Sequence, residues 1–191
     1  MTKIEEALAG RRSYYRIHKN LPVPAGQVER LVKELTEIVP DAFDMKSSRV
    51  ILLLGNKHDD FWDLVYDTFG GKVAREKIDS FKMGAGTVLY FYDEKVIDHM
   101  KETFPTYAEN FSVWANQSSG MLQLSIWTGL RELGIGATVQ HYNPAIDEAV
   151  KKRFGLPERY RMVAQMPFGG IGEEPAPKEK EEISLRVQII S

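Results

Sequence analysis

A short basic segment near the amino end carries the side chains best suited to bind an anion. Gly10-Arg11-Arg12-Ser13 follows a short helical stretch and places two guanidinium groups and one hydroxyl within three residues. Arginine offers forked donors to phosphate oxygens, and a serine hydroxyl adds another hydrogen bond. The alternative is a basic helix end that only complements the helix dipole. The segment by itself leaves both interpretations open.

A second basic pair, Lys178 and Lys180, flanks Glu179 near the carboxyl end. Taken alone, this pair indicates a solvated surface. It becomes relevant to an anion site only if the fold brings it to the arginines.

Several common chemistries are missing. The absence of cysteine excludes disulfides, thiolate nucleophiles and cysteine-ligated zinc. The four histidines contain no i, i+4 pair, so we expect no metal site. There is no G-x-S-x-G or Walker A pattern, and the glycines at 84–86 and 169–172 do not fit a dinucleotide-binding turn. A chain without these groups can still be an enzyme if a cofactor supplies the chemistry.

The composition predicts one globular domain over residues 1–191. The chain is 43% hydrophobic and carries a formal net charge of −2, which argues against a general nucleic-acid binder. No apolar run approaches the ~20 residues of a membrane span, and the first residues do not resemble a signal peptide. We therefore expect a cytoplasmic protein without membrane association.

Hydrophobic periodicity predicts helices and strands in alternation. Apolar residues recur at the helical period over 27–39. The apolar runs 49–54 and 87–92 are typical of strands covered on both faces. Further helices are expected at 4–8, 59–81 with a break at Gly70-Gly71, 94–104, 107–133 and 144–154, and further strands at 137–140 and 161–166.

Two segments point to a second subunit. Residues 107–133 are apolar around most of the helix circumference, as in a helix shared with a partner. Residues 173–182 form a charged linker, and 183–190 then alternate like a half-buried strand. A strand beyond a solvated linker can pair with another chain.

An ordered set of motifs runs from residue 11 to 169: Arg11-Arg12-Ser13, Phe43 to Gly55 with Ser47-Ser48-Arg49, Phe81 to Phe91, Trp114 to Gly136 with Ser118-Ser119-Gly120-Met121-Leu122-Gln123, Gln140-His141-Tyr142-Asn143-Pro144, and Gln165-Met166-Pro167-Phe168-Gly169. The set resembles the FMN-dependent nitroreductase superfamily, especially its fatty-acid-repression-mutant type and copper-induced members. The resemblance implies an α+β fold with a mostly antiparallel sheet flanked by helices. It also implies a homodimer with FMN at the interface and the last strand exchanged.

The resemblance assigns roles at the cofactor. Arg11 and Ser13 match residues at the FMN phosphate, and Arg12 matches one that approaches the ring. Lys82 matches a basic residue near flavin N1 and O2, where a cation stabilises reduced flavin. The alternative for Lys82 is an ordinary exposed lysine.

Other matches lie farther along the chain. Gln140 and His141 fall in a loop that faces flavin N5, where His141 either contacts substrate or serves as a structural cap. Lys178 and Lys180 match phosphate ligands less securely, because linker lengths vary in that region.

Three positions depart from the family pattern. Tyr15 stands where a basic residue is usual, which puts one phosphate or ribityl contact in doubt. Asp44 and Lys46 replace Asn and Gln. An aspartate there loses a donor and adds a charge, so it either contacts ribityl hydroxyls or leaves the contact to Lys46.

The resulting hypothesis is an FMN-dependent oxidoreductase that uses NADH or NADPH to reduce small aromatic oxidants, nitroaromatics or quinones, with ping-pong kinetics. One alternative is a flavin-binding stress or sensor protein with little turnover. Another is a dimerisation module without a cofactor.

Overall fold

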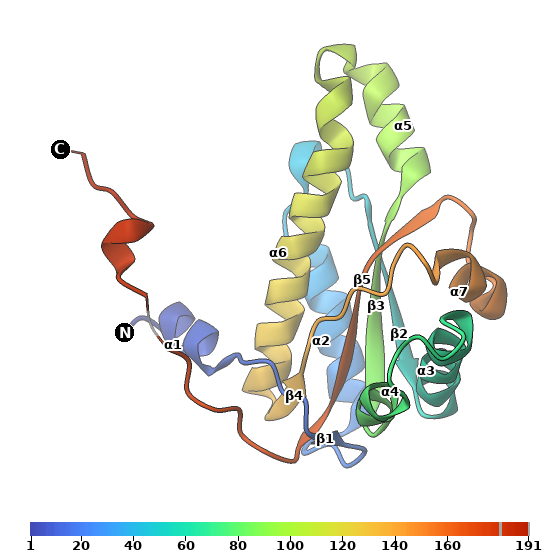
Figure 1. The fold of residues 1–191 in the computed structure, drawn as a ribbon. Coiled ribbons are helices and arrows are strands. Elements are labelled where there is room, and N and C mark those ends of the chain that lie inside the picture. Colours follow the sequence, from blue (N-terminus) through green and yellow to red (C-terminus); the bar gives the residue numbers. More distant parts are fainter. Residues whose placement is uncertain (180, 191) are drawn as a thin grey trace.

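A five-stranded sheet forms the centre of the computed structural model, which describes residues 1–179 and 181–190 (Figure 1). The strand order is β1-β5-β3-β2, β4 pairs with β5, and each of these pairings is antiparallel. The expected α+β fold is confirmed. The strands are β1 Ile17–His18, β2 Ser48–Leu54, β3 Gly86–Asp93, β4 Ile135–Ala137 and β5 Tyr160–Ile171.

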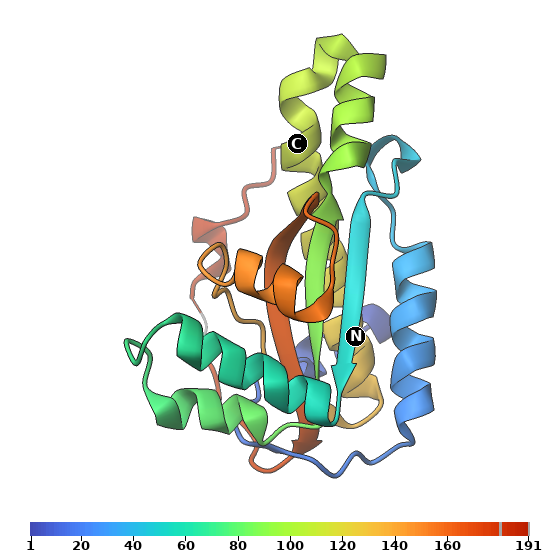
Figure 2. The same cartoon turned by 90° about the vertical axis from the view of Figure 1, so that its right-hand side faces the viewer.

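Helices cover both faces of the sheet. α2 and α6 pack on one face, and α3, α4 and α7 pack on the other (Figure 2). None of the helices in the described part of the chain has the length and apolarity needed to cross a bilayer. The helices are α1 Lys3–Gly10, α2 Ala25–Ile38, α3 Asn56–Thr68, α4 Arg75–Lys82, α5 Glu94–Thr103, α6 Phe111–Glu132 and α7 Asp147–Phe154, with short 3-10 turns η1 Ala42–Asp44, η2 Pro105–Asn110 and η3 Ile183–Leu185.

Side-chain alternation along β3 builds the two halves of the core. Val88 and Tyr90 belong to the cluster under α2 and α6, while Leu89 and Phe91 belong to the cluster under α3, α4 and α7. This is the two-residue period of a strand. The prediction of a strand buried on both faces is confirmed here. β2 also packs against both clusters, but as an edge strand it is less deeply buried, and Leu53 is its one fully buried side chain.

The prediction also misplaced some boundaries. The long helix begins at Phe111 because Pro105 opens a 3-10 turn before it. The strand expected at 137–140 is β4, which begins earlier because Gly134 ends α6 in the left-handed conformation, with φ of 76°. Within β4 the backbone passes close to Tyr14, so a Cβ on Gly136 would lie 2.9 Å from that side chain.

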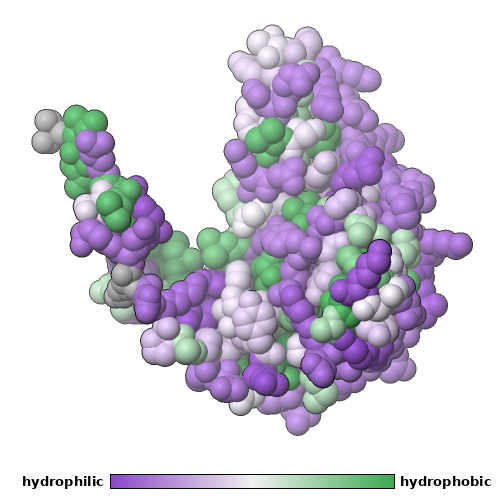
Figure 3. All heavy atoms as spheres, viewed as in Figure 1, coloured by the Kyte–Doolittle hydropathy of each residue, from purple (hydrophilic) through white to green (hydrophobic). Residues whose placement is uncertain are grey.

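The carboxyl-terminal segment is not a strand in the single chain. It contains η3, pairs with none of the described strands and projects from the body (Figure 1). Apolar side chains gather along this arm (Figure 3). The large apolar side chains of the arm that are more than half exposed are those of Ile183, Leu185, Val187, Ile189 and Ile190. Exposed apolar rows of this kind mark interaction surfaces, so strand exchange stays a prediction that needs a second chain.

Candidate functional site

The basic segment leaves α1 and joins the edge of the sheet. Arg11 ends α1 as its C-cap. Ser13 forms a parallel bridge with Ala137, whose carbonyl accepts a hydrogen bond of 3.0 Å from the Tyr14 N–H. The Arg11 backbone therefore lies at the end of α1, a position compatible with both interpretations. The contacts of the side chains decide what else the segment does.

The two guanidinium groups are held in place without a carboxylate ion pair among the described residues. Arg11 lies over the ring of Trp127, 4.1 Å from its centroid, and burial together with the adjacent Arg12 charge lowers the pKa of Arg11. Arg12 donates from Nη2 to the Ala176 carbonyl at 2.6 Å, and its buried Nε has no partner in the described part of the chain. Neighbouring like charges and an unsatisfied donor favour a bound anion. This donor set fits the phosphate of FMN.

Acidic residues beside the segment are compensated by other groups. Glu174 accepts a hydrogen bond of 3.0 Å from the Tyr14 hydroxyl and lies 3.9 Å from Arg131. Burial and the hydrogen bond to Glu174 raise the pKa of Tyr14, so its hydroxyl keeps its proton. The Glu174 charge is thus directed toward Arg131.

Two adjoining hollows connect the basic segment with the end of α4. Tyr15 lines both and is 55% exposed. Ser13 lines the first hollow, and Ser80 and Met83 line the second. The structure therefore brings the helix end that carries Lys82 to the same edge as the arginine segment.

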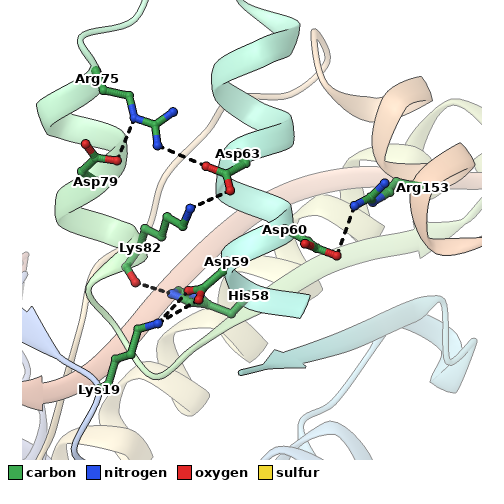
Figure 4. A network of polar contacts seen from close by, with 9 residues as sticks. All are labelled: Lys19, His58, Asp59, Asp60, Asp63, Arg75, Asp79, Lys82 and Arg153. Atoms are coloured by element: carbon green, nitrogen blue, oxygen red, sulfur yellow. Dashed lines mark hydrogen bonds and ion pairs between the residues drawn. The ribbon is translucent and has the colours of Figure 1, made fainter. Parts of the chain in front are cut away.

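Lys82 is not an ordinary exposed lysine. Its ammonium lies 2.6 Å from Asp63 Oδ2, and its side chain is only 27% exposed (Figure 4). The Lys82 carbonyl lies 3.3 Å from Nε2 of the buried His58. Sequence reasoning missed both partners, because helical periodicity places them on α3 but does not show which neighbouring element they face.

The loop of Gln140 and His141 runs beside β5. Gln140 exchanges backbone hydrogen bonds with Gln165 at 2.7 and 2.9 Å, and its side chain donates to Thr138 at 3.2 Å. The fully buried Gln165 side chain also accepts from the Tyr142 N–H at 2.8 Å. Gln140 thus has a structural role in the single chain, whereas His141 is exposed. Sequence reasoning assigned no role to Gln165, although a glutamine within an apolar strand was an available signal.

Asp44 and Lys46 lie at the opposite end of the sheet. Asp44 ends η1, and Lys46 lies between η1 and Ser48, which pairs with one end of β3, while the basic segment lies near the other end. β3 has eight residues and is roughly 25 Å long. Asp44 and Lys46 are mainly exposed and lie 3.7 Å apart as an ion pair. One chain therefore does not bring this pair to the arginines.

The two carboxyl-terminal lysines are not brought together with the arginines either. Lys178 is exposed and lines a hollow formed by the arm itself. Lys180 lies outside the described residues. The arm does pass the arginines at Ala176, two residues before Lys178, through the Arg12 hydrogen bond.

Known proteins share both this sequence and this fold. A model of the nitroreductase family matches residues 8–170. HBN1 of Saccharomyces cerevisiae is 30% identical over 189 residues, 97% of this chain and 96% of HBN1, and nitroreductase FRM2 of the same yeast is 30% identical over 85% of each chain. Nitroreductase CinD of Lactococcus lactis, in complex with chloramphenicol, has a TM-score of 0.94 and 35% identity over 99% of this chain and 100% of CinD. The chain belongs to the nitroreductase family, and it is a nitroreductase-type oxidoreductase.

Proposed function

We propose that this protein is a cytoplasmic, FMN-dependent oxidoreductase that uses NADH or NADPH to reduce nitroaromatic compounds or quinones. The observation that carries the proposal is the guanidinium pair of Arg11 and Arg12 with the unpartnered Arg12 Nε. In this proposal Arg11, Arg12 and Ser13 hold the phosphate. FMN held there would supply the hydride-transfer chemistry, at N5, that links the nicotinamide donor to the oxidant.

The relatives support the choice of ligand and substrate class. CinD structures hold chloramphenicol or the nitroaromatic 4-nitrophenol. Structures with the same fold from Exiguobacterium sibiricum and Desulfovibrio desulfuricans were solved with FMN. At 14% and 16% identity, they support only that a protein of this fold can hold FMN. The end of α4 that carries Lys82 lies beside the hollows next to the arginine segment, and in this proposal the ammonium faces the pyrimidine side of the flavin.

We further propose that two copies of the chain share each site. Asp44 and Lys46 match cofactor residues but lie at the far end of the sheet from Arg12, so a second copy must supply them.

A mixing experiment tests this arrangement. Arg12→Ala and Lys46→Ala homodimers should each bind FMN weakly. Mixing them with subunit exchange should restore one intact site per heterodimer. Failure of mixing to restore binding would contradict a shared site.

An anaerobic absorbance experiment tests the activity. FMN-loaded protein should lose its flavin absorbance when NADH or NADPH is added and recover it when 4-nitrophenol or a quinone follows. A flavin that binds but stays oxidised with both donors would support the sensor alternative. A protein that takes up no FMN would support the dimerisation module.

A further inference from the structure

A chain of alternating charges ends at Lys82. Asp63 accepts from the Lys82 ammonium at 2.6 Å through Oδ2, and from Arg75 Nη2 at 3.2 Å through Oδ1 (Figure 4). Arg75 Nε in turn donates to Asp79 at 2.9 Å. The hydrogen bond from Lys82 is the main cause that lowers the pKa of Asp63, so this carboxylate is ionised at neutral pH. The positive charge of Lys82 therefore lies next to the negative charge of Asp63.

Buried hydrogen bonds fix the backbone of the same lysine. Trp62 Nε1 lies 2.9 Å from Thr87 Oγ1, and Thr87 Oγ1 lies 2.8 Å from His58 Nδ1. The indole can only donate, so the hydroxyl proton of Thr87 is available to His58 Nδ1. The proton of neutral His58 then lies on Nε2, which faces the Lys82 carbonyl. Burial lowers the pKa of His58 and favours this neutral form.

Both contacts with Lys82 therefore come from α3. His58 orients its backbone and Asp63 orients its side chain. A free lysine side chain would lose conformational entropy on being fixed by a ligand. The half-exposed ion pair with Asp63 is expected to contribute little to folding stability. This pair matters more for where the ammonium lies than for folding.

We propose that Asp63 is a positioning residue that sets the place of the Lys82 ammonium and reduces its positive field at a bound flavin. This inference rests on the proposed function. A cation near flavin N1 and O2 favours the reduced, negatively charged cofactor. A carboxylate 2.6 Å from that cation opposes part of the effect. Lys82 with Asp63 therefore holds the flavin potential below the value that an uncompensated lysine would give.

The midpoint potential of FMN bound to the full-length protein tests the inference. Asp63→Asn keeps the size of the side chain and removes its charge, so the potential should become more positive. We expect about a tenfold gain in the preference for reduced over oxidised FMN, which is about 30 mV for a two-electron couple. Lys82→Met should shift the potential in the negative direction. In the Lys82→Met background, Asp63→Asn should give a smaller shift, because the direct field of the carboxylate is then removed without any change in the place of an ammonium.

Asp60 provides a matched control on the same helix. Its carboxylate lies 3.2 Å from Arg153, and Lys82 is not among its ion-pair partners in the described chain. Asp60→Asn makes the same charge change and should leave the potential near the wild-type value. If Asp63→Asn does not fold, Arg75→Gln removes a cation from the same chain of charges, and the potential should then fall.

Two results would overturn the inference alone. One is FMN bound by Asp63→Asn with an unchanged potential. The other is a shift of equal size with and without Lys82, which would show that Asp63 acts only as a distant charge. Wild-type protein that binds no FMN would instead overturn the proposed function, and the inference with it.

Discussion

Arg12 is the residue whose loss should weaken flavin binding most. Arg12→Ala removes a forked cation next to Arg11, and hydrogen bonds to charged groups contribute about 1.5–3 kcal/mol each. We expect the dissociation constant for FMN to rise about tenfold to a hundredfold, as measured by quenching of flavin fluorescence. Arg30→Ala is the control, because Glu34 is the one ion-pair partner of Arg30 among the described residues, on the exposed face of α2. Equal loss in both variants would contradict a phosphate role for Arg12.

His58 should give the protein a pH-dependent stability. Burial lowers the pKa of His58 in the folded state. Below the pKa of the unfolded chain, the unfolded state therefore binds a proton at His58 before the folded state does. The free energy of unfolding should therefore fall as pH drops below about 6.5, by up to about 1.4 kcal/mol per pH unit. Urea unfolding between pH 5 and 8 should show a shallower fall for His58→Gln. The exposed His99→Gln variant should follow the wild-type curve, and an unchanged slope in His58→Gln would refute the assignment.

Residue types alone were enough to propose Arg11, Arg12 and Ser13 as an anion site, because such a site needs cations close together, and their role stays a prediction. Residue types did not indicate the roles of Asp63 and Gln165. The roles of these two depend on which neighbour they meet across an interface between elements, and periodicity specifies only the face of a helix or strand.

At the scale of the elements, β5 pairs with β1 and leaves no space for a side chain at Gly169 or Gly170. A Cβ on Gly170 would collide with the His18 ring and the Asn20 carbonyl. Gly170→Ala should lower the free energy of unfolding by about 1–3 kcal/mol or more, since part of the clash is with backbone. Gly26→Ala, at an exposed position of α2 with open space, should be neutral or stabilise by up to about 1 kcal/mol. A Gly170→Ala variant as stable as wild type in urea would contradict this packing.

The elements that sequence predicted best are those with a strong period. α2 and β3 follow from their apolar spacing, and Gly70-Gly71 correctly separates α3 from α4. β4 was misplaced because Gly134 and Gly136 look alike in sequence. The first ends a helix, whereas the second lies inside a strand at a close contact with Tyr14.

At the scale of the whole molecule, the exposed arm should control assembly. Leu185 is 72% exposed in the single chain, and burying a leucine side chain contributes about 1.5–3 kcal/mol. If the arm docks on a second copy, Leu185→Asp should raise the dimer dissociation constant about tenfold or more in analytical ultracentrifugation. Ser184→Asp adds the same charge one position away and should have a smaller effect. Equal dimer dissociation constants for wild type and Leu185→Asp would argue against docking of the arm through Leu185.

Sequence predicted the arm as a strand, and the single chain does not form it. A strand requires a neighbouring strand for its backbone hydrogen bonds, and none of the described strands lies beside 183–190. The sequence also did not predict the separation of Asp44 from Arg12. Resemblance named both as cofactor residues, but nothing in the sequence indicated that they lie at opposite ends of one sheet.

The contact between Arg11 and Trp127 has a practical consequence. Trp127 lies under the guanidinium, and its indole N–H donates to the carbonyl of Ala137, the residue bridged to Ser13. An anion that draws Arg11 away from the ring changes the surroundings of that indole. The emission of Trp127 thus gives the chain an intrinsic optical reporter, able to follow occupancy of the anion site without a label.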